Sequence, residues 1–182
     1  MSDHGLDIQW KLIEPDDPMG SDMVDISPVT RKWTDVAYDD KSPSQVLDIY
    51  LPEEGEGPFA TYVFLHGGAF LFGDKQDVQF LLGIDGVNRG YAVVSVEYRR
   101  ALETKMPAAV YDVKAALRFL RAHAAEYHLD PERFALGGDS AGAYYAVFAA
   151  ATEGIAAFDG PDPANATFSS HVGAVIAQCG LY

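Results

Sequence analysis

The chain has 182 residues, of which 48% are hydrophobic, so it is long enough to bury one sizeable core and has the composition of a globular domain. Its 13 Lys and Arg residues against 27 Asp and Glu residues give a formal charge of −14, which disfavours nucleic acids and anionic membrane surfaces as partners. Cys179 is the single cysteine, which excludes an intramolecular disulfide and a cysteine metal cluster. We therefore expect one globular domain with no metal and no cofactor.

The start of the chain, Met1 to Pro15, is polar and acidic and has no basic segment that leads into an apolar run. No stretch of 18 consecutive apolar residues occurs in the sequence. We therefore predict a cytoplasmic protein. Residues 1–28 are rich in Asp and Pro, and composition leaves open whether they form a mobile arm or a small cap. We assign residues 1–28 to an N-terminal arm or partial cap and residues 29–182 to the core domain.

The order of the predicted elements indicates the fold class. Residues 32–38 and 45–51 are predicted to form a strand hairpin, joined by a turn rich in Asp, Ser and Pro. Strands and helices then alternate, as strand 60–66, helix 77–89, strand 92–98, helix 107–128, strand 133–138, helix 141–152 and strand 172–179. This alternation predicts an α/β fold with a mostly parallel sheet and helices on both of its faces.

The helix over 107–128 is the clearest single element. Apolar residues recur along it at spacings of three and four, and they form one stripe that is expected to face the sheet. We interpret the opposite, basic side as a solvated face; its members are Lys114, Arg118 and Arg121. We also expect a buried ion pair between Arg99 and Asp112, which would fasten the loop after the preceding strand to this helix.

The strand over 60–66 runs directly into His66-Gly67-Gly68-Ala69-Phe70. Glycines let the main chain approach a reacting group closely, and backbone N–H groups aimed at a developing oxyanion are preorganised donors. The motif therefore predicts an oxyanion hole formed by Gly67, Gly68 and Ala69, with the His66 side chain bracing the backbone. An ordinary glycine turn is the alternative for this motif taken alone.

The run Gly138-Asp139-Ser140-Ala141-Gly142 lies between an apolar strand and an Ala-rich helix. It has the form G-x-S-x-G, in which small residues on both sides of the serine allow a sharp turn that exposes the hydroxyl. A chance match is the alternative, because the chain holds 17 glycines. Since both motifs end strands in the expected order, we predict that Ser140 is a nucleophile and that the Ala141 N–H joins the oxyanion hole.

With these motifs the chain resembles the α/β-hydrolase superfamily, and within it the carboxylesterase branch that holds hormone-sensitive-lipase-like and feruloyl- or acetylxylan-esterase-like enzymes. Residues 45–52 look like the early strand of that group, residues 73–75 continue its glycine motif, and residues 97–112 look like its Y-R…P-A…D segment. The resemblance covers roughly residues 29–182. Ala69 stands where lipase-like enzymes usually carry a third glycine, which favours the feruloyl-esterase-like side.

The resemblance implies an α/β-hydrolase fold and a serine hydrolase that cleaves small acyl or aryl carboxylic esters through an acyl-enzyme intermediate. In that superfamily the acid and then the histidine of the triad follow the serine along the chain. His171 follows Ser140 too closely and precedes a strand, so we expect it to be a loop or strand-entry residue. We therefore expect a truncated chain that lacks its C-terminal strands, with the triad acid and histidine beyond Tyr182, and that is nearly inactive by itself.

Three aromatic side chains near the motifs, Phe70, Phe72 and Tyr144, are candidates for lining an acyl or aromatic-alcohol pocket, although a core position is the simpler alternative. The expected partner is a small-molecule ester, not a nucleic acid or a membrane, and the sequence does not indicate an oligomeric state. Two other functions stay open. A kynurenine-formamidase-like amide hydrolase also resembles this pattern, and a non-catalytic hydrolase-fold binding protein would keep the elbow without the triad.

Overall fold

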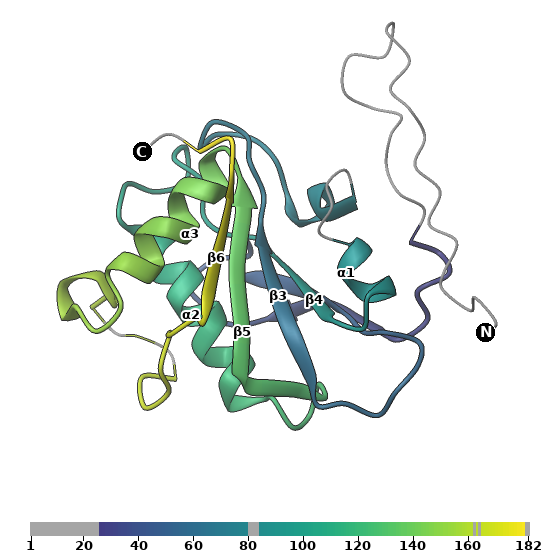
Figure 1. The fold of residues 1–182 in the computed structure, drawn as a ribbon. Coiled ribbons are helices and arrows are strands. Elements are labelled where there is room, and N and C mark those ends of the chain that lie inside the picture. Colours follow the sequence, from purple (N-terminus) through teal and green to yellow (C-terminus); the bar gives the residue numbers. More distant parts are fainter. Residues whose placement is uncertain (1–25, 80–83, 162, 164, 181–182) are drawn as a thin grey trace, which may run out of the picture.

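The computed structural model describes residues 26–79, 84–161, 163 and 165–180, and its centre is one six-stranded sheet (Figure 1). The strand order is β1-β2-β4-β3-β5-β6. The strands are β1 (Lys32–Ala37), β2 (Val46–Tyr50), β3 (Phe59–Leu65), β4 (Ala92–Val96), β5 (Leu129–Asp139) and β6 (Ala174–Gln178). The first two strands form the predicted antiparallel hairpin, and β3, β4, β5 and β6 are parallel to one another. The mostly parallel sheet predicted from the sequence is confirmed.

Helices cover both faces of this sheet, as predicted (Figure 1). Helices α2 (Ala108–Ala122) and α3 (Ala141–Ala151) pack on one face, while η1 (Lys75–Gln79) and α1 (Asp85–Asn88) lie on the other. A short 3-10 helix, η2 (Ala156–Phe158), follows α3. The predicted helix 77–89 is thus replaced, in its described part, by two short helices, and residues 80–83 lie outside the described residues.

The predicted helix 107–128 ends earlier than expected, at Ala122. Residues 123–128 form turns instead, and His128 adopts a left-handed conformation with φ of 57°, which reverses the chain into β5. The apolar stripe of α2 is confirmed, since Val113, Leu117 and Leu120 are buried in the main core cluster against the sheet. The core therefore lies between the sheet and the helix pair α2 and α3.

The basic side of α2 is not a solvated face, so that prediction was wrong. Lys114 is fully buried, and its Nζ atom donates to the backbone oxygen of Thr152 at 2.6 Å. Arg118 is also buried, and both cations pair with Asp159, at 3.3 Å for Lys114 and 2.6 Å for Arg118. Burial lowers the pKa of Lys114, and Asp159 opposes that shift. Buried charges persist only when they are paired, and the loop after α3 supplies the partner.

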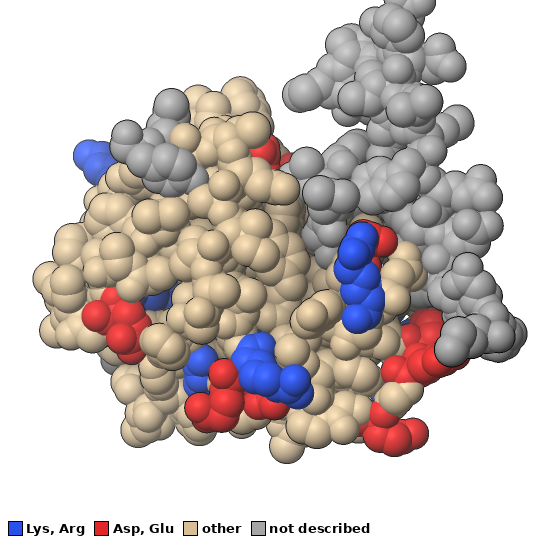
Figure 2. All heavy atoms as spheres, in the orientation of Figure 1, with Lys and Arg blue, Asp and Glu red and all other residues tan. Residues whose placement is uncertain are grey.

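Arg121 is likewise covered by other parts of the chain. Its guanidinium lies 4.8 Å from the centre of the Phe134 ring, and its Nη1 atom donates to the backbone oxygen of Ser169. Strand β6 forms an edge of the sheet among the described residues, and its Val175 and Ile176 are 38% and 47% exposed. Figure 2 shows that the surface over β6 and α3 is largely uncharged, with most charged side chains on that face lying near its lower margin.

No helix in the described ranges is long and apolar enough to cross a membrane. Within the same residues, no group of three or more His, Cys, Asp or Glu side chains is placed to hold a metal ion. Residues 1–25 of the predicted N-terminal arm lie outside the described residues. Ile26 and Val29 pack with the smaller apolar cluster on the α1 face of the sheet.

Candidate active site

Both sequence motifs lie at the C-terminal edge of the parallel strands, at the top of Figure 1. Leu65 at the end of β3 pairs with Gly138 near the end of β5. The segment that follows β3 and the turn that follows β5 therefore leave the sheet side by side. An open α/β sheet places its ligands beyond the carboxyl ends of its strands, so this edge is where a site is expected.

Ser140 occupies a strained turn between β5 and α3. Its φ of 49° and ψ of −110° lie outside the common conformations of a residue with a side chain. The turn is held from β6, because the Ser140 N–H donates to the backbone oxygen of Gln178 at 2.8 Å. A positive φ at the serine between a strand and a helix is the geometry that the G-x-S-x-G pattern predicts.

The two glycines around Ser140 are required by the neighbouring strand. A Cβ atom added at Gly142 would lie 2.1 Å from the backbone oxygen of Leu65, and one added at Gly138 would lie 2.5 Å from the same atom. Gly67 approaches the turn from the other side, since its added Cβ would lie 3.5 Å from the Cβ of Ser140. The elbow and the segment after β3 are therefore packed backbone against backbone.

The segment after β3 contains three consecutive residues with positive φ: 103° at Gly68, 53° at Ala69 and 68° at Phe70. Two backbone N–H groups, those of Leu71 and Phe72, donate to the backbone oxygen of Gly68 at 2.9 and 2.8 Å. This tight left-handed turn over residues 68–72 is called the oxyanion loop below.

The predicted oxyanion donors have no competing acceptors in the described part of the chain. The backbone N–H groups of Gly67, Gly68, Ala69 and Ala141 donate no hydrogen bond to any described residue. Three of them belong to the segment after β3, and Ala141 begins the helix whose positive dipole end points at Ser140. Free donors on both sides of Ser140 are available to hold a negatively charged oxygen.

His66 does not project into this site but braces it from beneath. The side chain is completely buried, and its ring stacks on that of Tyr98 at 4.2 Å with an interplanar angle of 5°. Its Nδ1 atom lies 2.9 Å from the backbone oxygen of Gly67, and the Tyr98 hydroxyl donates to the backbone oxygen of His66 at 2.7 Å. Burial raises the pKa of Tyr98, which keeps this hydroxyl a donor.

Glu97, the first residue of the segment 97–112 that resembles the carboxylesterases, is part of this support. One of its oxygens, Oε2, accepts a hydrogen bond from the backbone N–H of Lys75 at 3.0 Å. The other oxygen, Oε1, lies 3.6 Å from Nε2 of His66. Among the described residues, Oε1 of Glu97 and Nε2 of His66 have no hydrogen-bond partner. The signal in the sequence is the position of Glu97 directly before Tyr98 at the exit of β4, the strand that neighbours β3.

Asp139, between the elbow glycine and Ser140, is half-buried. Burial raises the pKa of its carboxyl group, and a hydrogen bond from the backbone of Ser140 acts in the opposite direction. Its Oδ2 atom faces the segment after β3, because a Cβ added at Gly67 would lie 3.0 Å from it. Asp139 thus places a carboxylate beside the candidate nucleophile.

No described histidine is positioned to activate Ser140. His171 precedes β6, whose far end at Gln178 meets Ser140, and seven extended residues span about 20 Å. His128 lies at the same distant edge, where its backbone oxygen accepts a hydrogen bond from Phe59 at the start of β3. The expectation that His171 is a strand-entry residue agrees with this placement.

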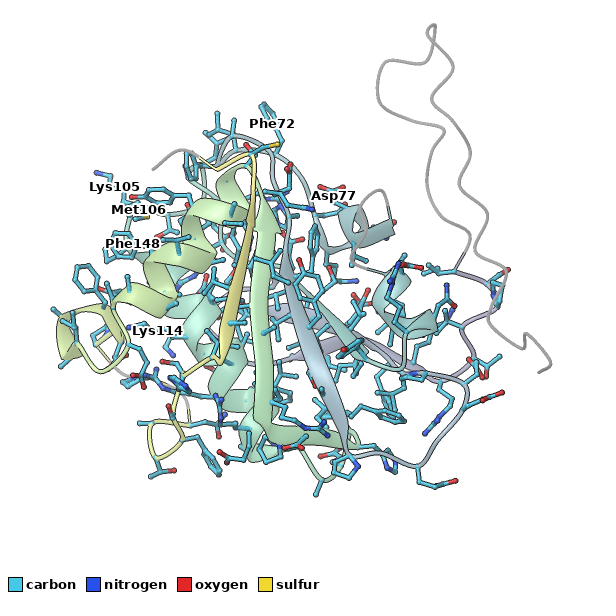
Figure 3. The ribbon with its side chains drawn as sticks, in the orientation of Figure 1. Phe72, Asp77, Lys105, Met106, Lys114 and Phe148 are labelled. Carbon is cyan, nitrogen blue, oxygen red and sulfur yellow. The ribbon has the colours of Figure 1, made fainter. Side chains whose placement is uncertain are left out.

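A cavity of about 540 Å³ adjoins the oxyanion loop and α3, and the pocket candidates Phe70 and Tyr144 are among the residues that line it. The Phe70 ring meets the rings of Tyr144 and Tyr145 edge to face at 5.6 and 5.4 Å. The third pocket candidate, Phe72, does not line this cavity and is 66% exposed. The tight turn over residues 68–72 directs Phe72 outward, as Figure 3 shows at the top of the molecule.

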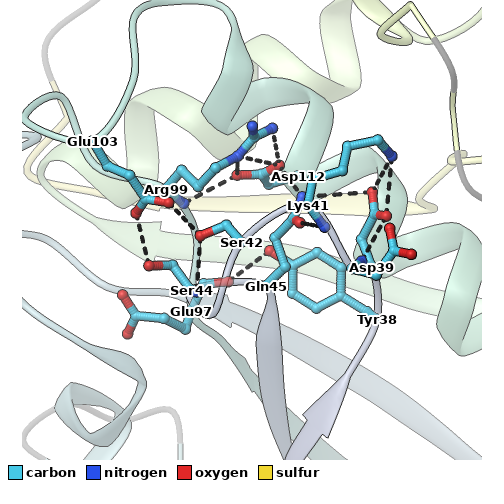
Figure 4. Close-up of polar contacts among 11 residues, drawn as sticks. Tyr38, Asp39, Lys41, Ser42, Ser44, Gln45, Glu97, Arg99, Glu103 and Asp112 are labelled. Atoms are coloured by element: carbon cyan, nitrogen blue, oxygen red, sulfur yellow. Dashed lines mark hydrogen bonds and ion pairs between the residues drawn. The ribbon is translucent and has the colours of Figure 1, made fainter.

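The predicted ion pair between Arg99 and Asp112 is confirmed and borders the same cavity (Figure 4). Nη2 of Arg99 lies 2.6 Å from Oδ1 of Asp112, and the backbone N–H of Arg99 donates to Oδ2 at 3.0 Å. Gln45 of the hairpin donates a further hydrogen bond to Oδ1 at 2.8 Å. The pair thus fastens the exit of β4 to α2.

Comparison with known proteins agrees with this geometry. The sequence model of the BD-FAE family matches residues 47–182. The probable isoprenylcysteine alpha-carbonyl methylesterase ICMEL1 of Arabidopsis thaliana is 36% identical over 120 residues, which are 66% of this chain and 24% of that protein.

Two solved structures are also similar. A bifunctional GH43-CE protein of Bacteroides eggerthii has a TM-score of 0.77 and 36% identity, covering 82% of this chain and 21% of that one. A truncated form of a carbohydrate esterase from gut microbiota has a TM-score of 0.75 and 32% identity, and the match covers 79% of this chain and 54% of that one. The chain thus spans about half or less of the length of these relatives. The likenesses confirm the predicted α/β-hydrolase fold and the resemblance to carboxylesterases.

Proposed function

The chain belongs to the BD-FAE family, and from that premise we propose that it carries the nucleophile and the oxyanion hole of a serine carboxylesterase acting on small acyl or aryl esters. The observation that carries the proposal is the strained turn at Ser140 beside backbone N–H groups that have no acceptor among the described residues. The relatives named above, a probable methylesterase and a carbohydrate esterase, support an ester as the substrate.

In the proposed reaction Oγ of Ser140 attacks the ester carbonyl carbon and its proton passes to a histidine base. The carbonyl oxygen becomes an oxyanion held by the N–H groups of Gly67, Gly68, Ala69 and Ala141, and each such donor is worth on the order of 10²–10³ in kcat. The base returns the proton to the leaving alcohol, and water then hydrolyses the acyl-enzyme.

The histidine and the acid that activate Ser140 come, in this proposal, from outside the described residues. The described chain by itself is then nearly inert, because a serine hydroxyl without a base is a weak nucleophile. We further propose that residues 1–28 form an arm or partial cap on a core over residues 29–182. Cell fractionation tests the predicted cytoplasmic location.

The test is Ser140→Ala in the protein expressed from its complete gene. We expect loss of short aryl ester hydrolysis and of labelling by a fluorophosphonate, with the fold retained, because a hydroxyl at a half-exposed turn contributes little packing. Ser169→Ala, at an exposed serine near β6, is the matched control and is expected to keep both properties. Labelling that persists in Ser140→Ala would remove Ser140 from the role of nucleophile. Faster turnover of a formanilide than of any ester would indicate an amide hydrolase.

A further inference from the structure

The cavity beside the oxyanion loop is bordered by cations, although the chain carries a formal charge of −14. Three of its ten lining residues are Arg99, Arg100 and Lys105, and none of the ten is acidic. These three belong to the segment that leaves β4, directly before α2. A local excess of positive charge in a strongly acidic chain indicates a ligand of negative charge.

The three cations differ in how much of their charge is available to a ligand. Arg99 is neutralised by Asp112 at 2.6 Å. Arg100 donates to the backbone oxygen of Gly73 at 2.6 Å and lies 3.6 Å from Glu97, with about a third of its side chain exposed. It therefore keeps part of its charge for the cavity.

Lys105 is the cation that is free. Its side chain is exposed, and its Nζ atom has no hydrogen bond or ion pair with any described residue. The acidic residue two positions before it, Glu103, is engaged instead by the hydroxyl groups of Ser42 and Ser44 (Figure 4). Lys105 and Met106 lie together at the side of α3 in Figure 3, and both line the cavity.

Three aromatic side chains also line the cavity. Phe70, Tyr144 and Tyr145 meet one another edge to face with ring centres 5.4 to 5.8 Å apart, and Ala109 adds a small apolar surface. A flat ring is the shape that packs well against such rings. The volume of about 540 Å³ lies in the range of small-molecule sites.

The cavity lies beside the candidate active site, because two of its lining residues, Phe70 and Tyr144, are close in the chain to Ala69 and Ser140. Phe70 directly follows Ala69 of the oxyanion loop, and Tyr144 lies one helical turn after Ser140, whose backbone oxygen accepts the Tyr144 N–H at 3.1 Å. A group bound in the cavity could therefore belong to the same molecule as an ester held at Ser140.

We propose that this cavity binds an aromatic carboxylate that forms part of the ester substrate. The ring packs against Phe70, Tyr144 and Tyr145, and the carboxylate is held by Lys105 with Arg100 as the second cation. The inference names the substrate class of the proposed esterase and rests on that function for its chemistry. The binding itself needs neither a triad nor turnover, so it is tested separately.

The first experiment measures binding to the chain of 182 residues by calorimetry or NMR titration. The probes are 4-hydroxybenzoate and its neutral analogue of the same shape, 4-hydroxybenzamide. We expect the carboxylate to bind about tenfold more tightly, with the preference falling as salt rises. Lys105→Gln should remove most of the preference. Lys32→Gln, which removes an equal charge from exposed Lys32 on the distant edge strand β1, should not. Equal affinity for both probes would overturn the inference.

The second experiment measures kcat/KM of the complete gene product for 4-acetoxybenzoate and for neutral 4-acetoxybenzamide. We expect Lys105→Gln to lower the value for the anionic ester about five- to tenfold and to leave the neutral ester unchanged. If the enzyme hydrolyses the neutral ester and Lys105→Gln does not lower kcat/KM for the anionic ester, the inference is refuted. The proposed esterase function would be unaffected by that result. Absence of all ester hydrolysis would instead refute the proposed function, and the binding experiment would then decide the inference alone.

Discussion

The elbow at Ser140 and the oxyanion loop are neighbouring left-handed turns, but they are held in different ways. The elbow is fixed by close packing, since Gly138 and Gly142 press against the backbone oxygen of Leu65 and leave no room for a side chain. Like the elbow at Ser140, the oxyanion loop carries side chains at positive φ, at the consecutive residues Ala69 and Phe70. It is fixed by hydrogen bonds together with one close backbone contact at Gly68, where an added Cβ atom would lie 2.2 Å from the backbone oxygen of Phe72.

The partners of the two turns also come from different parts of the fold. The elbow is held by β3 and by Gln178 of β6. The segment from Phe70 to Lys75 is held mainly by the exit of β4: the N–H of Ala101 donates to Phe70, Arg100 donates to Gly73, and Glu97 accepts from Lys75. The difference teaches that the elbow depends on the absence of side chains at Gly138 and Gly142, whereas the loop after Gly68 depends on partners from the exit of β4.

The largest expected effect tests the close packing of the elbow. Gly142→Ala would place a Cβ atom 2.1 Å from a backbone oxygen of β3, so the strand or the helix must move. We expect a loss of unfolding free energy on the order of 3–5 kcal/mol, measured by urea denaturation. Gly173→Ala is the control, because its nearest contact is at 3.7 Å, and it should change stability by less than about 0.5 kcal/mol. Equal effects of the two variants would show that the elbow is not tightly packed.

The next effect tests the support of the loop from β4. Glu97→Gln keeps the size of the side chain but removes the charge that Lys75 N–H, His66 and Arg100 face. We expect kcat of the complete gene product to fall about tenfold, equivalent to about 1.4 kcal/mol, with KM little changed.

The matched control for Glu97→Gln is Glu103→Gln, at an exposed carboxylate in the same segment that binds Ser42 and Ser44. It should leave kcat unchanged. An equal fall in both variants, or a change confined to KM, would argue against a positioning role for Glu97.

A smaller effect is expected at Ala69, whose φ of 53° is unfavourable for any residue with a Cβ. Ala69→Gly relieves that strain and keeps every N–H, so kcat should stay within about threefold and stability should change by no more than about 1 kcal/mol. Ala69→Pro is an ambiguous probe, because proline requires φ near −65° and would rebuild the loop as well as remove the N–H. A large loss of kcat in Ala69→Gly would show that the side chain itself is needed.

The smallest effect concerns Asp139, whose pKa is raised from its ordinary 3.8, mainly by burial. A raised pKa in the folded state means that the stability contributed by the protonated group is present below the unfolded pKa and is lost as pH rises through the folded pKa. We therefore expect Asp139→Asn to gain stability relative to the unmodified chain as pH increases from about 3.5 to 7. Urea unfolding of both proteins at about pH 3.5 and pH 7 measures this difference in unfolding free energy. The same difference at both pH values would contradict a raised pKa of Asp139.

The sequence by itself determined the order of the elements and the residue types at the site. Strand and helix periods depend on near neighbours, so the hairpin, the parallel strands and the apolar stripe of α2 were predictable. The G-x-S-x-G and His-Gly-Gly motifs indicated Ser140 and the loop because the local backbone geometry at both places requires glycine. The Arg99–Asp112 pair was also predictable from two short segments that follow one another in the chain.

Only the tertiary structure decided which side chains are covered and which distant segments meet. Lys114 and Arg118 lie on the polar side of α2, and nothing local shows that the loop bearing Asp159 folds over them. Phe72 and Phe70 are both aromatic residues of one loop, yet the turn at Gly68 sends only Phe70 to the cavity. Glu97 became part of the site because β4 lies beside β3 in the sheet. Burial depends on contacts between residues far apart in the chain, which periodicity and motifs do not encode.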